Sequence, residues 1–133
     1  MSSGARYRYS RDETIYGNSE DNQPANTERY YSSDGLAAAA DNVRGYIITT
    51  IGQITALYAR SSNPAGAGET FIYTVMLNGA PTALAVQIGG AVQQAANAVG
   101  AIAVVPEDRL TIRLVTSAAA AATQHQFSML HQH

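Results

Sequence analysis

The stretch that decides the fold runs from Glu69 to Ile88 and reads ETFIYTVML, then NG, then APTALAVQI. Its first half is rich in aromatic and β-branched residues, which favour strands. In its second half Leu84, Val86 and Ile88 alternate with smaller or polar residues, which is the period-2 pattern of a strand that buries one face. The stretch therefore predicts a β-hairpin.

Asn78 and Gly79 supply the turn of this hairpin. A two-residue type I′ turn needs positive φ at both central positions, which asparagine tolerates and glycine adopts without strain. The twist of such a turn matches that of the flanking strands. Pro81 follows just past the turn, where a missing amide hydrogen costs little if that position lies at a sheet edge. We expect Asn78 and Gly79 to be structural turn residues.

The composition describes one domain with a slight negative charge. The chain has 133 residues and a formal net charge of −2. A nucleic-acid binder usually carries a basic face that neutralises several phosphates, so this charge argues against that class. Cysteine is absent, which excludes disulfides, thiolate metal sites and cysteine nucleophiles. The chain shows no charged-then-apolar leader and no apolar run long enough to span a membrane, so a soluble protein is expected.

Residues 1–42 differ in character from the rest of the chain. They hold most of the charge and many of the tyrosines, but few large aliphatic side chains. Such a segment buries too little apolar surface to offset its ordering entropy alone, so we expect an extended N-terminal arm. Tyrosine and arginine are enriched at partner-binding surfaces, which predicts that the arm binds another protein. The predicted contact residues are Arg6, Tyr7, Arg8, Tyr9, Arg11, Tyr16, Arg29, Tyr30 and Tyr31.

Two other interpretations of these tyrosines stay open. The rings would cover the domain's own surface, or residues 29–33 would form a first edge strand. On the arm interpretation the chain divides into an arm at 1–42 and a β-sandwich domain at 43–133.

From residue 43 onward the sequence reads as short strands separated by breakers. Strands are expected at 46–51, 54–60, 97–105, 109–115 and 126–130, in addition to the hairpin. The three-residue spacing of Ile54 and Leu57 breaks strict alternation, which a β-bulge or a strand buried on both faces would explain. Residues 89–96 fit a short helix or a crossing loop. About seven short strands at regular spacing predict an all-β, antiparallel sandwich or barrel.

The order of these motifs resembles one group of proteins. Gly68-Glu69-Thr70-Phe71, Leu77-Asn78-Gly79 and the run from Pro106 to Ser117 follow one another as in small jelly-roll domains of bacteriophage virion proteins. Those domains are related in fold to the tumour-necrosis-factor and complement C-one-q heads. The resemblance covers residues 42–130 and departs at Glu107, where the family usually has glycine. It implies an antiparallel jelly-roll β-sandwich, a homotrimer and a place on a virus particle.

Few side chains are of the kinds that catalysis needs. The three histidines, His125, His131 and His133, lie near the end of the chain, and the last two would suit only a weak metal site because no carboxylate or cysteine is near them in sequence. A Ser-His-Asp set through His125 with Ser117 or Ser128 lacks the nucleophile-elbow context. We therefore expect no enzyme activity, no metal and no cofactor.

Two other motifs have simpler explanations than chemistry. Glu107 and Asp108 are adjacent, which suits a turn better than the paired carboxylates of a glycosidase. Gly66-Ala67-Gly68 lacks the third glycine and the following helix of a dinucleotide site, so it reads as a loop.

The favoured hypothesis is a phage capsid decoration or cement protein, a jelly-roll trimer whose arm lies along the shell or a neighbouring subunit. Many weak contacts over a multivalent surface would give avidity. The expected partner is the major capsid protein or another virion protein, with no nucleic acid and no membrane, on the surface of a particle made in the host cytoplasm. The alternative is the receptor- or glycan-binding head of a tail fibre or spike, with loops 61–68 and 118–123 as its binding rim.

Overall fold

The structure of the protein is a computed structural model, which describes residues 12–32, 35–41 and 45–133. Within these residues the fold is all-β, which confirms the predicted fold class, and no helix among them is able to cross a membrane. The strands are β1 (Asp12–Asn18), β2 (Glu28–Tyr31), β3 (Tyr46–Ile47), β4 (Gly52–Ser61), β5 (Gly66–Leu77), β6 (Ala80–Gly90), β7 (Gln94–Asn97), β8 (Ile102–Val104), β9 (Arg109–Thr116) and β10 (His125–Gln132).

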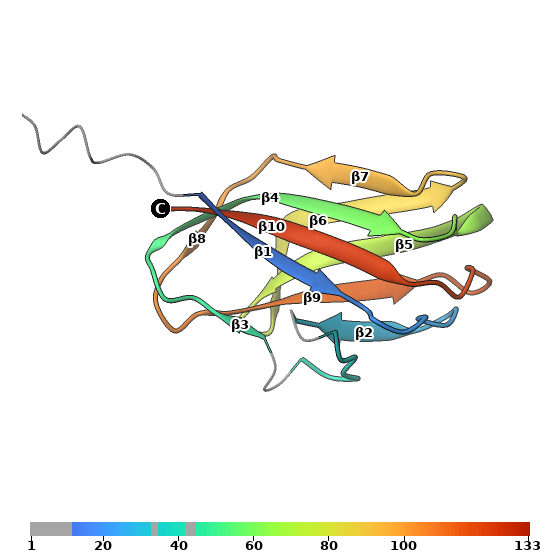
Figure 1. Cartoon of the computed structure of the whole chain (residues 1–133), viewed down its shortest axis with the longest axis horizontal. Coiled ribbons are helices and arrows are strands. Elements are labelled where there is room, and N and C mark those ends of the chain that lie inside the picture. The colour runs from blue at the N-terminus through green and yellow to red at the C-terminus, as the bar shows by residue number, and fades with distance from the viewer. Residues whose placement is uncertain (1–11, 33–34, 42–44) are drawn as a thin grey trace, which may run out of the picture.

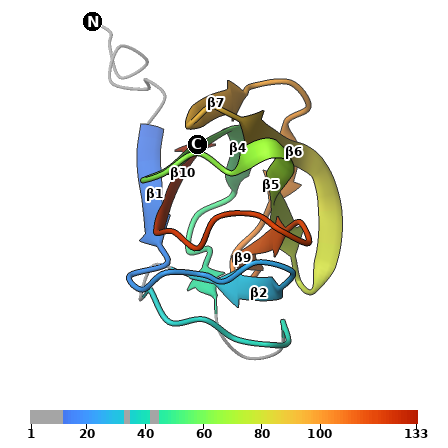
Figure 2. The ribbon, with the colours of Figure 1, turned by 90° about the vertical axis from the view of Figure 1, so that its right-hand side faces the viewer.

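The strands form two antiparallel sheets that face each other as a β-sandwich (Figures 1 and 2). In the first sheet the strand order is β1-β10-β4-β7, and the short β8 also pairs with β4. In the second sheet the order is β2-β9-β5-β6, and β3 also pairs with β9. We call them the β10 sheet and the β9 sheet after strands in their interiors.

The core lies between the two sheets and is built from alternate residues of their strands. Phe71 and Tyr73 of β5 are the largest of the fully buried side chains. Around them pack inward-facing aliphatic and aromatic residues of both sheets, whose removal from water is the main stabilising contribution. These residues include Ile15, Tyr31, Ile48, Ile54, Leu57, Val75, Leu84, Val86, Ile88, Val104, Leu110, Ile112, Leu114, Phe127 and Met129.

The predicted hairpin is present as β5 and β6. Asn78 and Gly79 have φ angles of 51° and 83°, so the predicted turn with two positive φ values is confirmed. The Asn78 side chain does more than permit the turn, because its Oδ1 accepts a hydrogen bond from the Arg109 amide at 2.9 Å and so joins the turn to β9. Strand β6 is an edge strand, which explains why Pro81 is tolerated.

Strand β4 contains the predicted irregularity. Leu130 pairs with Ala56 but His131 pairs with Ile54, so Thr55 is an extra residue on β4. This two-against-one pairing is a β-bulge, which was one of the two explanations of the spacing of Ile54 and Leu57.

Three strand predictions need correction. The strand expected at 46–51 is limited to Tyr46–Ile47, and the one expected at 97–105 is interrupted, with Asn97 in β7 and Ile102–Val104 as β8. Residues 94–96, where a helix or loop was expected, lie in β7 and pair with β4. Glutamine, alanine and asparagine have no strong preference for strands, so the pairing with β4 and not the local sequence determines this element.

The predicted boundary at residue 42 is wrong for the described residues before it. Strand β1 pairs with β10 along its whole length, and β2 pairs with β9. Ile15 and Tyr31 lie in the core. Residues 12–32 therefore contribute to both sheets, and the alternative of an edge strand within 29–33 is the one that the structure supports.

Residues 105–108 form a β-turn just before β9. The Asp108 amide donates to the Val105 carbonyl at 3.1 Å, and Glu107 at the third position has a φ of 77°. Proline at the second position and positive φ at the third are the features of a type II turn, in which the third position favours glycine. This is also the position at which the resembled family has glycine.

Glu107→Gly is expected to raise the free energy of unfolding by about 1 kcal/mol, because glycine adopts positive φ without strain, an effect partly offset by its larger entropy in the unfolded chain. Urea denaturation measures the change. Glu107→Ala is the matched control, since it removes the carboxylate but keeps the strained Cβ. A glycine variant no more stable than the alanine variant would show that Glu107 is not strained.

Candidate functional site

The outer face of the β10 sheet carries a groove with a volume of about 750 Å³. It crosses all four strands of the path β1-β10-β4-β7, whose register lines up two rows of side chains. The first row is Tyr16, Ser128, Tyr58 and Ala96, and the second row is Asn18, Gln126, Arg60 and Gln94. We call these eight residues the outer-face groove.

Strand alternation explains why these side chains point outward. On β1, Ile15 and Gly17 are buried whereas Tyr16 is exposed, and on β10, Phe127 and Met129 are buried whereas Gln126 is exposed. Gly17 allows the Phe127 ring to lie across β1, because a Cβ at residue 17 would come within 2.1 Å of that ring. The two rows of the groove therefore lie on the outer face of the β10 sheet, and the alternate residues of the same strands pack into the core.

The groove combines aromatic and polar groups. Tyr16 is 70% exposed and Tyr58 is 48% exposed, and the short side chain of Ser128 lies between them in the register. Arg60 has no ion-pair partner within the described residues, and with Gln126 it also lines a smaller adjoining pocket of about 250 Å³. Exposed tyrosine rings beside amide and guanidinium donors suit the binding of a protein surface or of a polar ligand.

The structure divides the predicted arm residues into three groups. Arg6, Tyr7, Arg8, Tyr9 and Arg11 lie outside the described residues. Tyr16 lies on β1 in the groove, whereas Arg29, Tyr30 and Tyr31 lie on β2 in the other sheet. The described members of the set therefore do not form one surface.

Tyr31 in particular is not available to a partner, which corrects its prediction as a contact residue. It is 3% exposed, and its hydroxyl donates to Oε1 of Gln23 within the sandwich. Burial raises the pKa of Tyr31 to about 12, so the phenol stays protonated. Tyr30 remains half-buried, and its hydroxyl donates to Glu28 at 2.9 Å. Burial and then this carboxylate raise the pKa of Tyr30.

The first of the two loops predicted as a binding rim is shorter than expected, because Ser61 belongs to β4 and residues 66–68 belong to β5, but residues 62–65 do lie beside the second loop. The Ser62 amide donates to the Gln124 carbonyl at 2.9 Å, and the Ala121 amide donates to the Ala65 carbonyl at 3.0 Å. Glu69 accepts hydrogen bonds from Ser117 and from the Ala119 amide, which lower its pKa. Hydrogen bonds thus hold the loops to each other and to β5.

The prediction that no carboxylate lies near His131 and His133 is wrong in three dimensions. Glu13 Oε1 lies 2.6 Å from His133 Nε2 and 3.8 Å from His131 Nδ1. The pairing of β1 with β10 causes this, because it sets Glu13 opposite His131. Burial is the main cause that lowers the pKa of His131, so this imidazole favours its neutral form.

His125 is buried in the core. Its Nδ1 shares a hydrogen bond of 2.6 Å with the Tyr73 hydroxyl, and its ring contacts Phe71 edge-on at a centroid distance of 4.6 Å. Burial lowers the pKa of His125 to about 4 and raises that of Tyr73. Both groups are therefore neutral near neutral pH.

The considered Ser-His-Asp set is not assembled through His125. Ser117 Oγ donates to Glu69, and Ser128 lies on the opposite face of β10 from His125. Asp108 accepts hydrogen bonds from Asn78 and the Val105 amide, which lower its pKa and hold it within its turn. Among the residues considered from the sequence, none forms a nucleophile-base pair.

Sequence reasoning missed most of the groove and also the contact between Glu13 and the histidines. Tyr58 lies two residues from Arg60 on β4, and Gln126 lies two residues from Ser128 on β10, which is the expected signal of one strand face. Which strands lie side by side could not be read from the sequence, so the rows could not be assembled. No family model matches the chain, and no curated protein is similar enough in sequence to be matched.

Proposed function

We propose that this chain is a non-enzymatic structural protein of a bacteriophage particle, a decoration protein that binds the shell as a homotrimer. The observation that carries the proposal is the outer-face groove, in which exposed Tyr16 and Tyr58 flank the small Ser128. Tyrosine and arginine supply much of the binding energy at protein interfaces. The groove is therefore the face through which copies of the chain associate in this proposal.

The topology supports the jelly-roll part of the proposal. The order β1-β10-β4-β7 faces the order β2-β9-β5-β6, so both sheets mix strands from the two halves of the chain. Greek-key connections of this kind build jelly rolls. The virion role itself rests on the resemblance in motif order, and the glycine-type turn at Glu107 agrees with that resemblance.

Tyr58→Ala is expected to weaken self-association about tenfold, since a central interface tyrosine contributes more than about 1 kcal/mol. Light scattering over a concentration series measures the mass of the wild-type chain, expected to be a trimer, and of the variant. Tyr30→Ala is the matched control, because Tyr30 lies on the other sheet. A monomeric wild-type chain would contradict the homotrimer.

The shell partner is tested separately. Labelled protein is mixed with purified capsids of the phage whose genome encodes the chain, and co-sedimentation is measured. Saturable binding at regularly spaced sites is expected. Failure to sediment with these capsids would remove the decoration role, whatever the oligomeric state.

A second candidate function is glycan binding by a fibre or spike head. The specific observation in its favour is the groove's combination of tyrosine rings with Asn18, Gln94 and Gln126, since rings stack on sugar faces and amides bond to hydroxyls. Titration with oligosaccharides distinguishes the candidates. If Tyr58→Ala removes sugar binding but leaves the trimer intact, the groove serves the glycan.

A further inference from the structure

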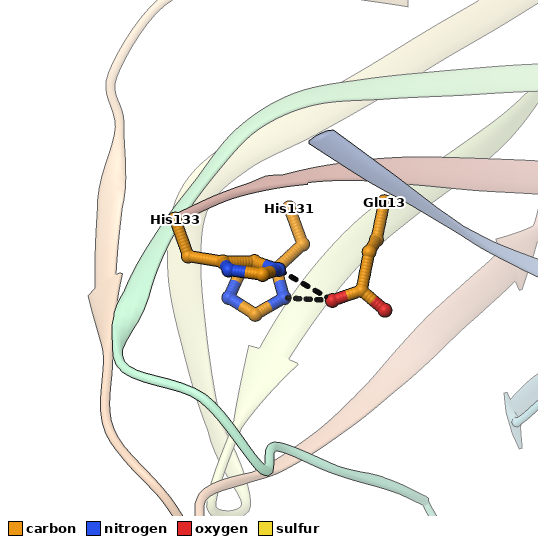
Figure 3. Close-up of side chains that lie close together, drawn as sticks. All are labelled: Glu13, His131 and His133. Carbon is orange, nitrogen blue, oxygen red and sulfur yellow. Dashed lines mark hydrogen bonds and ion pairs between the residues drawn. The ribbon is translucent and has the colours of Figure 1, made fainter. Parts of the chain in front are cut away.

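Glu13, His131 and His133 gather at the end of the sandwich where β1 begins and β10 ends (Figure 3). Glu13 is opposite His131 in the β1–β10 register, and His133 follows two residues after His131. In a strand, residues two apart share a face, so the histidines turn toward the same carboxylate. One ligand atom from each side chain lies within 4.8 Å of the other two.

His131 is the residue that a simple surface ion pair does not explain. The hydrogen bond between Glu13 and His133 gives a partner to the half-exposed Glu13 carboxylate and to the partly buried His133 ring. His131 is 1% exposed, and no regular hydrogen bond reaches either of its ring nitrogens within the described residues, although the Thr50 backbone lies close enough to act as a weak partner of one of them. Buried polar side-chain atoms are nearly always partnered, and the Thr50 backbone serves at most one of the two nitrogens, so the other lacks a partner that it would normally have.

The surroundings of His131 leave one nitrogen available to a ligand. Its Nε2 faces Gly52 of β4 closely, since a Cβ at residue 52 would lie 2.8 Å from it. Its Nδ1 faces Glu13 at 3.8 Å. The bulge at Thr55 adjoins this pair, and bulges often redirect side chains beside functional sites.

The donor set matches a late first-row divalent cation. Two imidazoles and one carboxylate, with no thiolate, are ligands of Zn²⁺, Co²⁺, Ni²⁺ and Cu²⁺. Bonds of about 2.0–2.1 Å place the ligand atoms of a tetrahedral zinc ion about 3.3 Å apart. The distance from Glu13 Oε1 is 2.6 Å to His133 Nε2 and 3.8 Å to His131 Nδ1, so one lies below that value and the other above it. Side-chain rotations that move these ligand atoms by about 1 Å would complete the geometry.

We infer that Glu13, His131 and His133 form a binding site for a zinc-type divalent cation that ties β1 to β10. The ligand atoms are the Glu13 carboxylate, His131 Nδ1 and His133 Nε2. A fourth coordination position faces solvent, because the Glu13 side chain is 49% exposed. The cation would hold the edge strand β1 in the β10 sheet, whatever partner the outer-face groove binds.

The test uses the full chain without a polyhistidine tag. Calorimetric titration with ZnCl₂ near neutral pH is expected to show one saturable site per chain, and CoCl₂ is expected to give the intense visible absorption of a four-coordinate site. Glu13→Gln and His133→Gln should each weaken binding at least tenfold, since even changes in residues that only support a metal ligand commonly cost about 10–100-fold. Glu13 is half-exposed and His133 lies just past the end of β10, so both changes are compatible with folding, which near-ultraviolet circular dichroism checks.

Asp12→Asn is the matched control. Asp12 precedes Glu13 on β1 and pairs with Gln132, so it points to the other side of the strand. The zinc affinity of Asp12→Asn should equal that of the wild type. ZnCl₂ should raise the melting temperature of these two proteins but not that of Glu13→Gln. Absence of saturable zinc binding, or equal binding by the Glu13→Gln and wild-type chains, would overturn the inference.

Discussion

Ile15→Ala is expected to lower the free energy of unfolding by about 3 kcal/mol, within the range of about 2–5 kcal/mol for truncating a buried isoleucine. Ile15 is 4% exposed and lies opposite Met129, where β1 packs against the core. The truncation removes apolar contacts and leaves a cavity that the paired strands cannot fill by moving. Urea denaturation followed by circular dichroism measures the loss.

Ile51→Ala is the matched control for this change. It makes the same chemical change at a residue that is 67% exposed, so its effect should stay within about 0.5 kcal/mol. The comparison also tests where the domain begins. If Ile15→Ala were as stable as the wild type, β1 would contribute nothing to the folded domain, and the separate arm predicted from composition would be the better description.

The protein is also expected to lose about 3 kcal/mol of stability between pH 6.5 and pH 4 through His125 alone. The pKa of His125 falls from 6.5 in the unfolded chain to about 4 in the folded protein, because burial disfavours the charged imidazole. A depressed histidine pKa means that the unfolded chain binds the proton first as pH falls. The contribution of His125 is therefore complete above pH 6.5 and lost progressively toward pH 4, at about 1.4 kcal/mol per pKa unit.

His125→Gln isolates this contribution. Glutamine does not titrate, and its amide is able to keep a hydrogen bond with the Tyr73 hydroxyl. The variant is expected to be less stable at neutral pH, because it loses the ring contact with Phe71, but its stability should fall less between pH 6.5 and pH 4. His131 and the carboxylates of Glu69 and Asp108 titrate in both proteins and cancel in the difference. Parallel stability curves would mean that His125 is not neutral in the fold.

The sequence predicts well those strands and turns whose signal lies within the residues that form them. The hairpin at Asn78-Gly79 carries its turn chemistry within two residues, and the alternation of Leu110, Ile112 and Leu114 identifies β9. Such elements are specified by the residues that form them.

What the sequence failed to predict were elements that depend on a distant partner. Strand β1 has only Ile15 as a large aliphatic residue, and its hydrogen bonds come from β10 at the other end of the chain. The proximity of Glu13 to His131 and the rows of the groove follow from the same long-range register. No local periodicity reports which strands become neighbours, so the boundary at residue 42 and the isolation of the histidines were both misjudged.

The position of β10 between β1 and β4 has a consequence for how the protein is made. Strands β1 and β4 are synthesised early but do not pair with each other. They are held in one sheet only after residues 125–132 have been made and pair with both of them. Contacts between residues so far apart in sequence form slowly, on a scale of milliseconds to seconds. Until then the nascent chain exposes strand edges and apolar surface to other molecules in the cell, so chaperone supply during translation is expected to limit the yield of folded protein.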